Sequence, residues 1–83
     1  MERVKKAKCI SAGDLIKTSE SDESYLHVYA TYTTNWKGNI SLHFSCLRTS
    51  LDGTYTSIEV KRYTPEDEII LVRDKSEKMP WLE

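Results

Sequence analysis

Three stretches in the middle of the chain alternate apolar and polar side chains, which is the pattern of a half-buried β-strand. They cover residues 25–34, 40–48 and 55–63. The turn at 35–39 has hairpin length and contains Gly38, where a positive φ is expected. Asp52-Gly53, a strong hairpin signal, separates the second stretch from the third. The pattern therefore predicts a three-stranded antiparallel meander.

The segments on either side of this meander are less regular. Residues 3–10 favour an edge strand, although their apolar positions also suit a turn of helix. Pro65 ends the third strand of the meander because proline cannot donate a hydrogen bond to a neighbouring strand. Residues 68–73 (EIILVR) form a compact apolar run, which predicts a strand buried on both sides.

Residues 11–18 allow two interpretations. A tight turn at Gly13-Asp14 leading into a short strand is the one we favour, and a single helical turn capped by Ser11 is the alternative. We predict a mainly β fold, a small antiparallel meander of four to six strands that can close into an SH3-like or OB-like barrel. The alternative is an α+β fold with one short helix near residues 11–18. A single β domain is expected over 1–74, followed by an extended C-terminal tail over 75–83.

Strict alternation also predicts which side of the sheet is buried. It assigns these side chains to the core: Leu26, Val28, Ala30, Tyr32, Ile40, Leu42, Phe44, Cys46, Ile58 and Val60. The opposite face is amphipathic and rich in tyrosine, which gives a large contact area at a low cost in entropy. We predict a binding face formed by Tyr25, His27, Tyr29, Tyr55, Lys61 and Tyr63. The competing interpretation is that these side chains only stabilise an exposed sheet by packing across strands.

Composition narrows the choice of partner. The chain has 83 residues, with 12 Lys and Arg against 13 Asp and Glu, a net charge of −1 that argues against a general binder of phosphate backbones. Only 39% of the residues are hydrophobic, so either the core is thin or the chain gains burial by pairing with another copy or with a partner. Trp81 in the tail is a possible anchor for a partner, or else a cap on one end of the sheet.

The search for catalytic chemistry finds no nucleophile elbow, phosphate-binding loop or zinc-protease motif. The two histidines, His27 and His43, are too few for a metal site, and no cofactor is expected. Cys46 lies in an apolar row, where a thiol is inert, and no base is placed near Cys9. We therefore expect no enzymatic activity.

The chain begins without an apolar signal segment and has no apolar run long enough to cross a membrane. Its only two cysteines are widely separated, so we expect reduced thiols and a cytoplasmic location without membrane contact.

The function best supported by these patterns is a non-catalytic binding module, with a protein partner or a second copy of the chain. Small, near-neutral chains of this kind are typical of regulators or inhibitors encoded by phages and mobile elements. One alternative is an OB-like or SH3-like nucleic-acid-binding protein that stacks bases on exposed tyrosines. The other is a small β-barrel that binds a ligand in its interior.

Overall fold

The computed structural model describes residues 3–78. Within that range the chain forms six β-strands and one short 3-10 helix, η1, and no α-helix. The elements are β1 (Arg3–Lys6), η1 (Ala7–Cys9), β2 (Leu15–Lys17), β3 (Ser24–Trp36), β4 (Asn39–Ser50), β5 (Tyr55–Tyr63) and β6 (Glu68–Arg73). All neighbouring strands run antiparallel in one sheet of order β1-β6-β2-β3-β4-β5. The predicted mainly β fold is confirmed.

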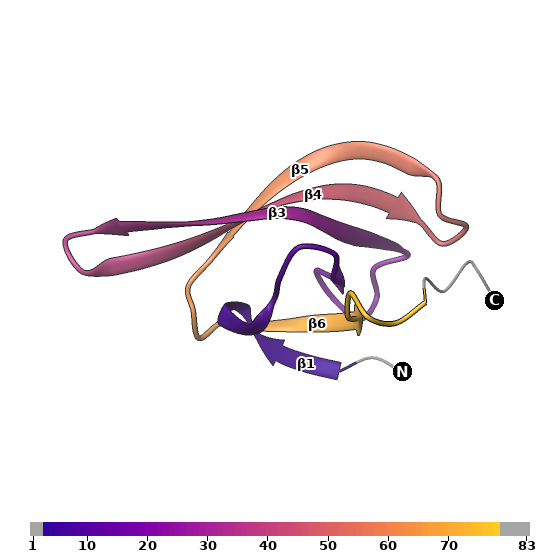
Figure 1. Ribbon diagram of the computed structural model, residues 1–83. Helices are drawn as coiled ribbons and strands as arrows, with labels where there is room; N and C mark the ends of the chain where they lie inside the picture. Colours follow the sequence, from indigo (N-terminus) through magenta and orange to yellow (C-terminus); the bar gives the residue numbers. More distant parts are fainter. Residues whose placement is uncertain (1–2, 79–83) are drawn as a thin grey trace.

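The sheet is strongly bent, so that β3, β4 and β5 lie over β1 and β6 (Figure 1). The two edge strands, β1 and β5, do not pair with each other, so the sheet remains open. It therefore does not close into the barrel that the strand count allowed. Two sheet edges are left with main-chain groups that no neighbouring strand of the described chain uses.

The β3–β4 hairpin follows the predicted pattern. Its two-residue turn consists of Lys37 and Gly38, with φ values of 50° and 83°. Two successive positive φ values define a turn whose twist matches that of the strands it joins. The Asn35 side-chain oxygen accepts a hydrogen bond from the Gly38 amide at 3.0 Å, which further closes the turn.

Residues 11–18 form a turn followed by strand β2, as the favoured interpretation predicted, and not a helix. Gly13 has a φ of 99°, which lets the chain reverse before the strand. Asp14 is buried, and its carboxylate accepts hydrogen bonds from the amides of Ser11 and Lys75, both at 2.9 Å. This carboxylate therefore ties the turn to the segment that follows β6.

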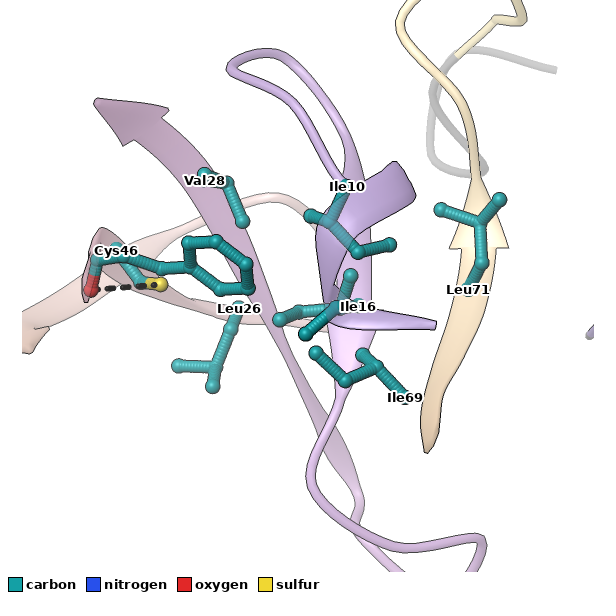
Figure 2. Close-up of a cluster of buried hydrophobic side chains, with 9 residues drawn as sticks. Ile10, Ile16, Leu26, Val28, Cys46, Ile69 and Leu71 are labelled. Carbon is teal, nitrogen blue, oxygen red and sulfur yellow. Dashed lines mark hydrogen bonds between the residues drawn. The ribbon is translucent and has the colours of Figure 1, made fainter. Parts of the chain in front are cut away.

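The core lies inside the bend of the sheet. Figure 2 shows side chains from β2, β3, β4 and β6 converging there with Ile10, which follows η1. The buried cluster is Ala7, Ile10, Ile16, Leu26, Val28, Phe44, Cys46, Ile69 and Leu71. Burial of a large apolar side chain contributes about 1.5–3 kcal/mol, so these few residues supply much of the driving force for folding. In β6, Ile69 and Leu71 are buried but Ile70 and Val72 are only half-buried, so the strand is fully buried on one side and partly covered on the other.

A β-bulge at Tyr29 reverses the alternation within β3. Val28, before the bulge, enters the core. Tyr32, after it, lies opposite His43 on the other face of the sheet. The prediction that Ala30 and Tyr32 point into the core was therefore wrong, because it assumed unbroken alternation through one extra residue.

A second bulge, at Thr56, has the same effect on β5. If the register of the Thr49–Tyr55 pair continued along β5 without a bulge, Ile58 would lie opposite Cys46 and enter the core. The structure instead places Ile58 opposite Leu47, on the outer face. Val60 follows Ile58 to that face and is 61% exposed. The assignment of Ile58 and Val60 to the core was wrong for this reason.

Beyond the core, β3 and β4 continue as a two-stranded arm formed by residues 33–40, all of them exposed (Figure 1). The arm accounts for the elongated shape of the molecule, which measures 45 by 24 by 24 Å. Ile40 was predicted in the core but is 42% exposed, because no other element packs against the arm. Trp36 at the tip is 73% exposed, with the Lys37 ammonium 5.5 Å from its ring centre.

After β6 the chain turns at residues 74–77 and stays attached to the domain. The Arg73 guanidinium is buried and donates hydrogen bonds to the carbonyls of Gly13, at 2.8 Å, and Glu77, at 2.9 Å. The remainder of the predicted tail, including the proposed anchor Trp81, lies outside the described residues.

Candidate functional site

The outer face of β3, β4 and β5 is turned away from β1 and β6 (Figure 1). It carries four rows of three side chains, because residues paired across antiparallel strands share a face. The rows are Tyr32–His43–Arg62, Ala30–Ser45–Val60, His27–Leu47–Ile58 and Tyr25–Thr49–Tyr55. We call these twelve residues the open face, within which Thr49 is buried.

Several apolar and aromatic side chains of the open face are exposed to solvent. Ile58 is 68% exposed and Val60 is 61% exposed, and both lie on the edge strand β5. Tyr55 and Tyr32 are 55% and 53% exposed. The Tyr32 ring stacks on His43 with centroids 4.5 Å apart and planes inclined by 2°. Stacking fixes the Tyr32 ring in place, so a contact with it costs little additional entropy.

None of the twelve open-face residues carries a carboxylate, although the chain contains 13 acidic residues. The cationic group is Arg62, which is exposed and lies opposite His43. Burial lowers the pKa of His27, and the charge of Arg73 lowers it further, which favours the neutral imidazole. The open face therefore combines apolar and aromatic surface with positive charge at one end.

Half of the predicted binding residues lie on this face. Tyr25, His27 and Tyr55 belong to its rows, and the His27 and Tyr55 rings lie 6.4 Å apart. Tyr29 is the bulge residue and is 47% exposed. These four positions remain predicted binding residues, with Tyr29 outside the four rows.

The other two predicted binding residues, Lys61 and Tyr63, point to the opposite side of the sheet. The Tyr63 ring packs against Phe44 at a centroid distance of 5.5 Å and covers the margin of the core. Burial raises the pKa of Tyr63 accordingly. The Lys61 ammonium lies 3.3 Å from the Glu59 carboxylate. The six predicted residues therefore do not form one surface, since the bulge at Thr56 divides those of β5 between two faces.

Arg48 is the centre of an ion-pair network on the same side as Lys61. Its guanidinium donates two hydrogen bonds to Glu59, at 2.6 and 2.9 Å, and one to Asp22 at 3.0 Å. The bonds from Arg48 lower the pKa of Glu59 to about 2. Burial opposes ionisation of Asp22, but hydrogen bonds from Thr18 and Arg48 outweigh it and lower its pKa to about 2. Asp22 lies in the loop before β3, Arg48 in β4 and Glu59 in β5, so the network links these three parts of the chain.

Sequence reasoning missed Tyr32, Ile58, Val60 and Trp36 as surface residues. The first three follow the two bulges, and neither bulge has a glycine that would signal it. Trp36 carried a usable signal, because it stands beside the turn of a hairpin whose neighbouring residues, Thr33, Thr34 and Asn35, are polar.

The two cysteines lie in different surroundings. Burial raises the pKa of the Cys46 thiol to about 11, while Cys9 is exposed. Among residues 3–78 no three His, Cys, Asp or Glu side chains come together in a way that could hold a metal ion. A cleft of about 180 Å³ between η1 and the base of the arm is smaller than a typical ligand pocket.

No helix in the described part of the chain has the length and apolar character needed to cross a membrane. Comparison of the sequence and the structure with protein families, with curated proteins and with solved structures gives no match.

Proposed function

We propose that this protein is a non-catalytic protein-binding module that docks through the open face. The observation that carries the proposal is the exposure of Ile58 and Val60, at 68% and 61%, in a chain whose core is thin. Exposed apolar side chains are ordinary when scattered, but here they adjoin Leu47 and Tyr55 on the same face. Such a patch gains free energy when a partner covers it.

The residue types of the open face support a protein partner. Tyrosine and arginine are enriched among the residues that dominate binding energy, and Tyr32, Tyr55 and Arg62 are all exposed. Charged residues are depleted at the centres of interfaces. On the open face the exposed charge, Arg62, lies at one end and the apolar rows lie at the centre.

The charges of the open face indicate the surface chemistry of the partner. A complementary surface is apolar at its centre and presents a carboxylate to Arg62, because the open face offers no carboxylate of its own. A small regulator or inhibitor works in this way, by covering a functional surface of its partner. The sources suggested by composition, phages and mobile elements, encode many such proteins.

The test introduces negative charge into the open face without changing the fold. The double variant Tyr32→Glu/Tyr55→Glu alters two exposed positions, and Trp36→Glu, an exposed aromatic at the tip of the arm and outside the open face, is the control. Each protein is immobilised and used to capture partners from the lysate of the cell that produces it. We expect at least one protein that binds the wild type and Trp36→Glu but not the double variant. Equal capture by all three proteins, or no capture, would discard the open face as a docking surface.

A titration with single-stranded oligonucleotides at low salt distinguishes the nucleic-acid alternative. The predicted binding residues are divided between two faces, since Tyr63 packs on Phe44 and Lys61 pairs with Glu59. We expect no saturable binding. Saturable binding that weakens with salt and is lost in Tyr32→Glu/Tyr55→Glu would show that the partner is a nucleic acid and not a protein.

A further inference from the structure

The two edges of the sheet differ in length and in chemistry. β1 offers four residues, three of them cationic, so two copies of this edge would repel each other. β5 offers nine residues and carries Glu59 close to Lys61. No strand of the described chain lies beyond it (Figure 1). An uncovered strand of this length is a template on which another strand can add.

We propose that β5 pairs with β5 of a second copy of this chain, antiparallel, about a two-fold axis at Val60. The pairing would join the two sheets of the copies edge to edge into one continuous sheet. It uses the edge of the molecule and does not depend on the open face binding another protein.

The length of regular strand selects the position of this axis. The bulge at Thr56 interrupts β5, so its regular part runs from Ser57 to Tyr63. Val60 is the midpoint of that segment. An axis at Val60 brings every residue of the segment opposite a residue of the second copy, whereas an axis moved by one position leaves two residues unpaired at the end of the ladder. The register centred on Val60 therefore forms the most hydrogen bonds.

The charges of β5 select the same register. With the axis at Val60, Glu59 lies opposite Lys61 of the second copy, and Lys61 lies opposite Glu59 of the second copy. Opposite charges on paired residues stabilise an antiparallel ladder, and like charges directly opposite destabilise it. An axis at Glu59 would place the two Glu59 carboxylates opposite each other, and an axis at Lys61 would do the same for the two ammonium groups. Strand length and charge thus agree on one arrangement.

The other side of the ladder supplies apolar contact. Val60 would meet Val60 of the second copy, and Ile58 would meet the aliphatic stem of Arg62 of the second copy, because all three lie on the open face. This contact covers the side chains whose exposure is 68% and 61% in the single chain. The open faces of the two copies would become continuous across the junction.

Light scattering over a range of concentrations tests the association. An edge contact is small and its charges are partly exposed, so we expect a weak dimer that dissociates as salt is added. Lys61→Glu would place four carboxylates around the axis and should weaken dimerisation at least tenfold. Lys37→Glu, the same change of charge at the tip of the arm, is the matched control and should dimerise as the wild type does. A strictly monomeric wild type at about 1 mM would overturn the proposal.

Cross-linking tests the register. In a Cys9→Ser background, which removes the exposed native thiol, Val60→Cys would bring two thiols directly opposite each other. We expect a disulfide-linked dimer on mild oxidation. Ile58→Cys is the control, because the proposed register separates the two Ile58 positions by four residues along the ladder. Cross-linking of both variants to the same extent, or of Ile58→Cys alone, would reject this register. Failure of the open-face experiment would leave both results unchanged.

Discussion

The base and the arm of the β3–β4 hairpin consist of the same two strands but depend on different interactions. At the base, Leu26, Val28 and Phe44 pack inside the bend of the sheet. In the arm, residues 33–40 are all exposed and hold together through main-chain pairing and the Lys37-Gly38 turn. A two-stranded ribbon without a buried face is only marginally stable. The comparison shows that the free energy of folding is concentrated at the base, which leaves the residues of the arm free to vary.

Two substitutions in β4 give the sharpest contrast. Phe44 is 1% exposed, and Phe44→Ala should lower the free energy of unfolding by about 3–5 kcal/mol, because it removes apolar contacts and leaves a cavity. Ile40→Ala, four residues earlier and in the arm, should change it by less than about 0.5 kcal/mol. Urea denaturation followed by circular dichroism measures both values. Similar losses for the two variants would show that the arm contributes to stability as much as the base.

Two glycines allow the same comparison at the level of the main chain. Gly13 has a φ of 99°, and an added Cβ would lie 2.8 Å from the Lys75 Cβ, so Gly13→Ala should cost about 2–3 kcal/mol through strain and steric conflict. Gly38 has a φ of 83° with no atom within 4 Å of an added Cβ. Gly38→Ala should cost about 1 kcal/mol, and only locally.

Amide hydrogen exchange distinguishes these two effects. We expect Gly13→Ala to accelerate exchange throughout the sheet and Gly38→Ala to accelerate it in the arm alone. Faster exchange at the base of the Gly38→Ala variant would mean that the arm and the base unfold together.

The ion pairs of Arg48 make the base sensitive to acid. The carboxylates of Asp22 and Glu59 have pKa values of about 2 in the folded protein, against about 4 in an unfolded chain. Because the folded pKa is the lower one, the stabilisation is complete above about pH 4 and is lost as the pH falls towards 2.

Arg48→Met tests this prediction. It should lower the free energy of unfolding by about 2 kcal/mol at pH 7, after allowance for the partial exposure of the pairs. The difference from the wild type should shrink as the pH falls from about 4 to about 2. A difference that stays constant over that range of pH would assign the effect to packing of the Arg48 stem instead.

The smallest effect is expected at the tip of the arm. Trp36 is 73% exposed, and the Lys37 ammonium lies 5.5 Å from its ring centre. Trp36→Ala should therefore change the free energy of unfolding by less than about 0.5 kcal/mol. Thermal denaturation measures this change, and a clear fall in melting temperature would show that the indole ring packs on the fold.

Alternation and turn residues were sufficient to predict the three central strands, the hairpin turn at Gly38 and the short strand after Gly13. These features are local, because they depend on side-chain period and on a few special φ values. The faces of β3 and β5 were not predictable in this way. A bulge adds one residue to one strand, and neither Tyr29 nor Thr56 differs in type from the residues around it.

The open face illustrates the consequence of that limit. Its tyrosines at 25 and 55 were predicted as a binding surface, but its most exposed apolar residues, Ile58 and Val60, had been assigned to the core. One unpaired residue before them was enough to exchange the two sides of the strand. Whether the sheet closes also depends on contacts between residues far apart in the chain, which single-sequence patterns do not contain.

The bulge at Tyr29 influences the direction in which the arm projects from the base of the sheet. Tyr29 has no cross-strand partner, so loss of its single codon would leave every other pair between β3 and β4 in place. It would also remove the local bend and the additional twist that a bulge imposes on its strand. The direction of the projecting hairpin, and with it the position of its indole ring, could thus be altered by one heritable deletion while the buried core keeps its composition.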